Sequence, residues 1–132
     1  MTTSPGGSTF PYYYRGGEIH CLKYGSHFDD EEKLFRLMEA ERDFILKKPN
    51  LHVRVWTDFY ETAITANVLL RFVENIAQMH DRILKLAVVG LSKANQHNLM
   101  RLVKKSPSDF APCRFFMDPE EAKTWLVSEV PV

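Results

Sequence analysis

The chain has 132 residues, of which 45% are hydrophobic and 26% charged, a composition typical of one soluble globular domain. Seventeen Lys and Arg residues balance seventeen Asp and Glu residues, so the formal net charge is zero. This balance argues against nucleic acid or an anionic membrane surface as a partner, because both attract strongly basic proteins.

The first ten residues are rich in Ser, Thr, Pro and Gly, and we expect a flexible tail over 1–10 followed by a single domain over 11–132. The tail lacks the basic start and apolar core of a signal peptide. No apolar run reaches the roughly 18 residues of a membrane span. The two cysteines, Cys21 and Cys113, lie in apolar runs typical of buried, reduced thiols. These features predict a cytoplasmic protein.

Strand and helix patterns begin directly after the tail. Gly16-Gly17 separates two predicted strands, 12–15 and 18–24, because glycine readily supplies the positive φ of a hairpin turn. Apolar residues at helical spacing predict a helix over 29–48, and Pro49 ends it. The chain is therefore expected to open with a hairpin and a helix.

Alternation of strands and helices continues through the middle of the chain. The period-two pattern of 51–56 predicts a strand with one buried face and one less buried face, and Trp56 lies on the less buried one. The wide apolar stripe of 62–79, which includes Leu70, predicts a helix that covers a sheet. The apolar run 85–90 predicts an interior parallel strand, most buried over Leu86–Val89.

Two capping patterns mark the last helices. Ser92 is a natural N-cap for a helix that ends near Lys105. Residues 113–117 predict the last strand, and Asp118-Pro119-Glu120-Glu121 has the cap acceptor and the proline that open a closing helix. The predicted class is α/β, with a sheet of four or five mainly parallel strands, an opening hairpin and four helices joined by right-handed crossovers.

From Gly17 to Glu129 the chain resembles the STAS group of SpoIIAA-like anti-sigma-factor antagonists. The resemblance is carried by residues 53–58, by residues 85–91 and by the run RFFMDPEEAKTWL over 114–126, which is similar to the closing strand and helix of that family. It implies a SpoIIAA-like fold and a small, cofactor-free, cytoplasmic binding module that is not an enzyme.

The same resemblance implies a regulatory hydroxyl at the start of the helix after the third core strand. The family box there is roughly Asp-Ser-Ser/Thr-Gly, and the matching loop over 58–67 lacks it. Thr62 and Thr65 are its nearest hydroxyls. The resemblance therefore implies the fold more directly than phosphorylation.

The loop from Asp58 to Thr65 runs from the carboxyl end of a strand into a helix, which is where open α/β sheets bind ligands. We predict a binding or regulatory site made by Asp58, Thr62, Thr65 and Asn67, with Ser92 across the crevice. The alternative interpretation is that these residues only cap helices and end strands.

Opposite charges gather on two predicted helices. One side of the helix after Ser92 carries Lys93, His97, Arg101 and Lys104 or Lys105. The first helix carries carboxylates at Asp30, Glu31, Glu32, Glu39 and Glu41. These surfaces predict a protein partner, with a homodimer as one form of it. The alternative is that both are ordinary solvated faces.

Chemical motifs are scarce. His20, Cys21 and His27 make the nearest approach to a metal site, but adjacent strand residues point to opposite faces. The chain has no nucleophile elbow, glycine-rich phosphate loop or dinucleotide fingerprint. We therefore predict no metal, cofactor or catalytic residue.

A non-enzymatic regulatory or protein-binding module is the leading functional hypothesis. A carrier of a small apolar ligand or lipid in a cleft of the same fold is the main alternative. A receiver-like phosphoacceptor built on Asp58 and Ser92 is a third hypothesis, weakened because the expected acidic pair and lysine have no evident counterparts.

Overall fold

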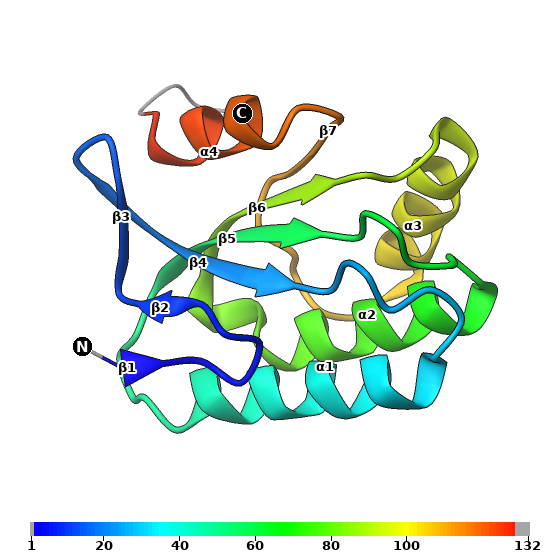
Figure 1. Ribbon diagram of the computed structural model, residues 1–132, viewed down its shortest axis with the longest axis horizontal. Coiled ribbons are helices and arrows are strands. Elements are labelled where there is room, and N and C mark those ends of the chain that lie inside the picture. The colour runs from blue at the N-terminus through cyan, green and yellow to red at the C-terminus, as the bar shows by residue number, and fades with distance from the viewer. Residues whose placement is uncertain (1, 129–132) are drawn as a thin grey trace.

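Five strands form one sheet whose order follows the chain, β3-β4-β5-β6-β7 (Figure 1). The computed structural model describes residues 2–128, so the end of the predicted domain, 129–132, lies outside the described residues. Strand β3 is antiparallel to β4 and the other pairs are parallel. The strands span Tyr12–Tyr14 (β3), Gly17–Lys23 (β4), Val53–Asp58 (β5), Ile83–Val89 (β6) and Cys113–Phe116 (β7).

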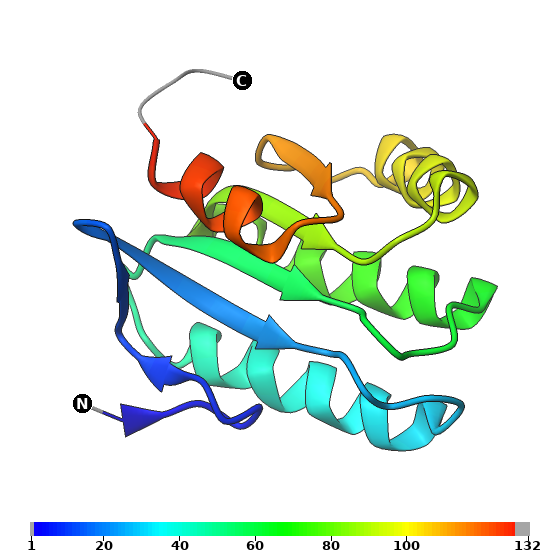
Figure 2. The ribbon, with the colours of Figure 1, turned by 45° about the horizontal axis from the view of Figure 1, so that its top comes forward.

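Three helices cover one face of the sheet and a fourth covers the other (Figures 1 and 2). Every parallel connection steps one strand further in the same direction, and crossovers of one hand then place all their helices on one face. The helices are α1 (Glu31–Leu46), α2 (Ala66–Gln78), α3 (Lys93–Lys105) and, on the opposite face, α4 (Pro119–Val127). A short 3₁₀ turn, His80–Arg82, leads into β6.

Each face of the sheet has its own apolar core. Val55 and Val88 belong to the larger core beneath α1, α2 and α3, whereas Trp56 and Ala87 pack in a smaller core with Trp125 of α4. Residues 86–89 are almost completely buried, which confirms the predicted interior strand. Trp56, on the face predicted to be less buried, is also buried, because α4 covers that face.

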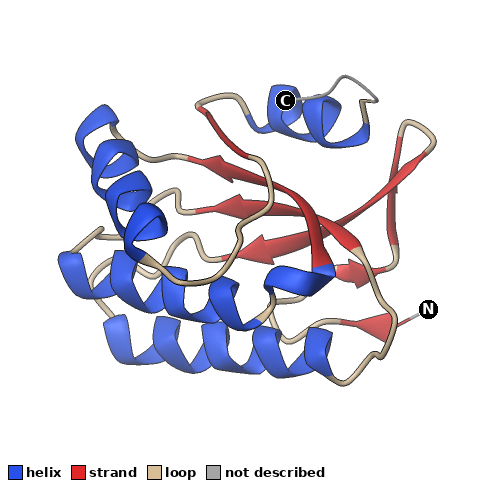
Figure 3. Ribbon diagram, turned by 180° about the vertical axis from the view of Figure 1, so that it is seen from behind, coloured by secondary structure: helices blue, strands red, loops and turns tan. Residues whose placement is uncertain are grey.

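Local signals marked most element boundaries correctly. Ser92 and Asp118 accept backbone N–H bonds as the N-caps of α3 and α4, as predicted. The opening hairpin is confirmed, but its two turn residues are Arg15 and Gly16, with φ of 47° and 83°, and Gly17 begins β4. Helix α2 begins at Ala66 rather than near Thr62, because Thr65 is its N-cap. The expected four helices and mainly parallel sheet are therefore present (Figure 3).

Helix α4 is bound to the sheet by polar contacts as well as by apolar packing. Lys85 Nζ donates to the carbonyl oxygens of Trp125 at 3.0 Å and Ser128 at 2.8 Å, which occupies acceptors at the carboxyl end of the helix. The Lys123 ammonium lies 5.1 Å from the centre of the Trp56 ring. These contacts hold α4 over the sheet face that the crossover helices leave uncovered.

The N-terminal segment differs from the expected flexible tail. Strands β1 (Thr2–Thr3) and β2 (Thr9–Phe10) pair as an antiparallel hairpin. Ser4, Ser8 and Phe10 within this segment are buried. Its polar composition predicted a tail, but the polar groups are used in contacts with a distant helix.

A buried carboxylate explains how this hairpin is held. Glu41 of α1 is fully buried; its Oε2 accepts hydrogen bonds from Ser4 Oγ and the Gly6 N–H, each at 3.0 Å. Its Oε1 lies 3.1 Å from His20 Nε2 of β4. The His20 ring itself packs against Phe10 and Phe44, which also contact each other. One carboxylate therefore joins the hairpin, the sheet and α1, and Glu41 does not belong to the predicted acidic surface.

Replacing Glu41 by alanine should lower the free energy of unfolding by about 3 kcal/mol, because His20 and Ser4 lose their buried partner. Chemical denaturation measures this change. Glu32→Ala is the matched control: Glu32 lies on the same helix in an exposed pair with Arg36, and its loss should cost less than about 0.5 kcal/mol. Equal effects of the two substitutions would contradict the role given to Glu41.

Candidate functional site

The carboxyl ends of β4, β5 and β6 open onto one edge of the sheet, where the predicted site was placed. Thr62 is held within this edge. Its hydroxyl donates to the Tyr24 carbonyl at 2.8 Å and accepts from the His27 N–H at 3.1 Å. These bonds join the loop after β5 to the loop after β4, so Thr62 has a structural role here.

Thr65 is exposed and joins the beginnings of two helices. Its hydroxyl accepts the Val68 N–H at 3.1 Å as the N-cap of α2 and donates to the Glu31 carboxylate of α1. A phosphate on this hydroxyl would lie beside Glu31, where like charges repel. The capping interpretation thus accounts for the contacts that Thr65 makes.

Asp58 and Ser92 lie in separate pockets. Asp58 Oδ1 accepts the Tyr60 N–H at 2.9 Å, and its side chain lines a pocket at the carboxyl ends of β5 and β6. Ser92 caps α3 through the Asn95 N–H and lines a second pocket with Lys93 and Met117. The five predicted site residues are therefore not brought together in one crevice.

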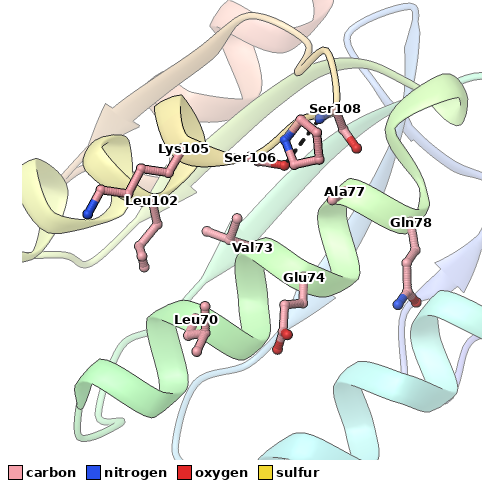
Figure 4. A pocket seen from close by; sticks show the side chains of 10 residues that line it. Leu70, Val73, Glu74, Ala77, Gln78, Leu102, Lys105, Ser106 and Ser108 are labelled. Carbon is pink, nitrogen blue, oxygen red and sulfur yellow. Dashed lines mark hydrogen bonds between the residues drawn. The ribbon is translucent and has the colours of Figure 1, made fainter.

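An extended hollow of the surface lies between α2 and α3. It consists of two adjoining pockets of about 490 and 500 Å³, which share Leu70, Leu102 and Lys105. We call this feature the α2–α3 groove; its lining includes at one end Ile64, Thr65, Ala66, Asn67, Leu69, Asn95, Asn98 and Arg101, and at the other Val73, Glu74, Ala77, Gln78, Ser106, Pro107 and Ser108. Figure 4 shows the second of these ends, with Leu70, Val73 and Leu102 between the two helices.

The groove joins residues that the sequence analysis assigned to separate surfaces. Thr65 and Asn67 of the predicted site line the same end as Arg101 of the predicted partner surface. Lys104 and His97 are exposed or partly exposed but lie outside the lining, and Lys93 lines the pocket of Ser92 instead. The basic helix thus presents only part of its charge to the groove.

Leu70 lies in the groove, although the sequence pattern placed it against the sheet. Its position in the apolar stripe of 62–79 predicted contact with the sheet, yet 46% of its surface is exposed. The buried stripe of α2 runs through Val68, Leu69, Phe72, Val73 and Ile76, next to Leu70. The only available signal was that the stripe is wider than one buried face requires.

Charge is distributed unevenly along the groove. Helix α3 contains no acidic residue, and within residues 2–128 none of its basic side chains lies within ion-pair distance of a carboxylate. The acidic residues of α1 are engaged elsewhere: Glu39 pairs with Arg71 at 3.5 Å and Glu32 with Arg36 at 2.9 Å. The predicted contact between a basic and an acidic helix surface is therefore only partly supported. The basic side chains of α3 are available for a partner, whereas most acidic side chains of α1 already have partners within the chain.

The two cysteine thiols are protonated at neutral pH. Burial raises the pKa of the Cys113 thiol to about 12 and also raises the pKa of the Cys21 thiol. A thiol, unlike a thiolate, is a poor nucleophile and a poor metal ligand. Cys21 belongs to the core under α4, whereas His20 faces Glu41 of α1, so their side chains lie on opposite faces of the sheet. Within residues 2–128, no three His, Cys, Asp or Glu side chains are grouped as a metal site.

None of the helices in residues 2–128 combines the length and the hydrophobicity of a membrane span. Comparisons with models of protein families, with curated proteins and with solved structures give no significant match to this chain. The function is therefore inferred from the groove, its charges and the sequence resemblance.

Replacing Thr65 by valine should lower the free energy of unfolding by about 1 kcal/mol, because the α2 N-cap and the bond to Glu31 are both lost. Thr65→Ser keeps the hydroxyl and should remain within a few tenths of a kcal/mol of wild type. Thermal or chemical unfolding distinguishes them. Equal stability of the valine and serine variants would show that the hydroxyl does not stabilise the start of α2.

Proposed function

We propose that this chain is a non-enzymatic, SpoIIAA-like protein-binding module that takes an acidic, apolar segment of a partner protein into the α2–α3 groove. The fold part of the proposal is supported by the sequence resemblance and by a chain-ordered sheet with three crossover helices on one face. The binding part is supported by the groove alone.

One observation carries the proposal: an apolar groove is bordered by cations that have no carboxylate partner within residues 2–128. Leu70 and Leu102 offer apolar surface to an incoming side chain, and Arg101 and Lys105 border the same hollow. Apolar burial supplies affinity, whereas unpaired surface cations mainly steer a partner of opposite charge and fix its orientation. The expected ligand therefore combines leucine-like side chains with Asp or Glu.

The shape of the groove agrees with a peptide. A hollow between two neighbouring helices accepts a third helix whose apolar residues recur every three or four positions. Glu74 borders the end that Lys105 also lines, so the partner's carboxylates should lie toward Arg101, away from Glu74. This charge pattern gives the bound segment one preferred direction.

The other partners considered from the sequence are less well supported. A carrier of an apolar ligand needs an enclosed cavity, whereas this groove is open to solvent and bordered by charged side chains. A homodimer was expected because α1 was predicted to present an acidic surface. Glu41 is buried, and Glu31, Glu32 and Glu39 have partners within the chain.

A peptide-display selection on the immobilised protein tests the proposal and needs no identified partner. Wild type should enrich peptides that combine Asp or Glu with Leu, Ile or Phe. Their dissociation constants should rise about tenfold in Arg101→Glu, because the new carboxylate repels the acidic peptide. For wild type the dissociation constants should fall in low salt, because the charge of Arg101 is then less screened. Fluorescence anisotropy with a labelled selected peptide measures both effects.

Lys104→Glu is the matched control, since it makes the same charge change on the same helix outside the groove lining. Its effect on the dissociation constant should be less than about threefold. Equal weakening by Lys104→Glu and Arg101→Glu would indicate attraction by the helix as a whole and contradict a site at the groove. Enrichment of neutral or basic peptides that bind Arg101→Glu unchanged would also contradict the proposal.

A further inference from the structure

The pocket that Asp58 lines, at the carboxyl ends of β5 and β6, shares no lining residue with the α2–α3 groove. Its volume is about 540 Å³. It is lined by Asp58, Tyr60, Val89, Gly90, Met117 and Pro119. These residues come from the ends of β5 and β6 and the residues that follow them, from the connection between β7 and α4, and from the first residue of α4. The pocket therefore lies on the α4 side of the sheet edge.

The carboxylate of Asp58 is fixed in this pocket. Its Oδ1 accepts the Tyr60 N–H at 2.9 Å, and a Cβ at Gly25 would come within 3.2 Å of its Oδ2. Within residues 2–128, no basic side chain lies within ion-pair distance of Asp58. Lys23, which pairs with Asp58 from the neighbouring strand β4, donates instead to the Gly7 carbonyl at 3.4 Å. The carboxylate is positioned but has no counter-charge there.

Two exposed apolar side chains border the same pocket. Tyr60 is 63% exposed and Met117 is 70% exposed, although such side chains are usually more buried. Within residues 2–128, the Tyr60 ring takes part in no aromatic pair and faces no Lys or Arg. A polarizable aromatic face and a thioether beside a carboxylate make a surface suited to an organic cation.

The backbone at Gly90 keeps this pocket in shape. Gly90 has a φ of 92°, and a Cβ there would come within 3.2 Å of the Tyr60 nitrogen. The two strand ends can approach closely only because this position has no side chain. Val89 and Pro119 add apolar surface to the lining, against which the methylene stem of a long side chain can pack.

We propose that this pocket binds an arginine side chain. Its guanidinium group donates hydrogen bonds to the Asp58 carboxylate, and the face of that group or the methylene stem packs against Tyr60 and Met117. A carboxylate oxygen held by one N–H retains lone pairs for the guanidinium fork, and guanidinium groups stack on aromatic rings. An anionic ligand is disfavoured by the Asp58 carboxylate, which lines the pocket. The site is independent of the α2–α3 groove and takes a ligand group of opposite charge.

An NMR titration of the ¹⁵N-labelled chain with N-acetylarginine methylamide tests this site. The amide resonances of Tyr60 and Gly90 should shift in a saturable way. N-acetylcitrulline methylamide, which has a similar shape and no charge, should bind about tenfold more weakly. Absence of shifts up to the solubility limit of the arginine compound, or equal binding of both compounds, would overturn the proposal.

Two variants assign the binding to the named side chains. Asp58→Asn keeps an acceptor for the Tyr60 N–H and should weaken binding of the arginine compound about tenfold. Tyr60→Ala should weaken it about threefold. Asp109→Asn and Tyr13→Ala, which remove the same groups from exposed positions elsewhere, should bind as wild type. Wild-type binding by Asp58→Asn, or equal weakening by the Asp109 variant, would overturn the assignment.

Discussion

The three parallel connections of the sheet all step in one direction, from β4 through β5 and β6 to β7. Crossovers of uniform hand must place α1, α2 and α3 side by side on one face, so the other face of the interior strands has to be covered by a segment from outside the crossovers. The closing helix α4 does this, with Trp125 packed near Trp56. The same constraint creates the groove between α2 and α3 and directs the parallel strand ends to one edge.

Two surfaces of opposite character follow from that arrangement. The crossover layer ends in α3, whose side chains carry positive charge and whose contact with α2 leaves Leu70 and Leu102 in an open groove. The strand-end edge carries the carboxylate of Asp58 beside exposed Tyr60. A module built in this way can contact acidic and basic groups of one partner at separate places, which favours a defined orientation of the bound protein.

Element types were predictable because their signals are local. The caps at Ser92 and Asp118 depend on side chains within three residues of the helix start, and the apolar run before Gly90 depends only on composition. The buried Glu41 was not predictable, since its partners Ser4 and His20 are distant in sequence and the carboxylate otherwise resembles a surface residue. The hairpin formed by residues 2–10 was missed for the same reason, because that contact orders a segment whose composition resembles a tail.

The pockets of the surface were less predictable than the helices and strands, because each is lined by residues from several elements. The rule that ligands bind at strand ends predicted one crevice for Asp58 and Thr65, but Asp58 lies on the α4 side of the strand-end edge and Thr65 lies by the groove between α2 and α3. Hydrogen-exchange mass spectrometry of the chain with and without a partner protein captured from its own cell tests binding at the α2–α3 groove. Binding at the groove should confine protection to residues 64–78 and 93–108, together with 58–60 if an arginine of the partner is also bound. Protection of the β3 edge or of α4, with residues 64–78 and 93–108 unchanged, would contradict it.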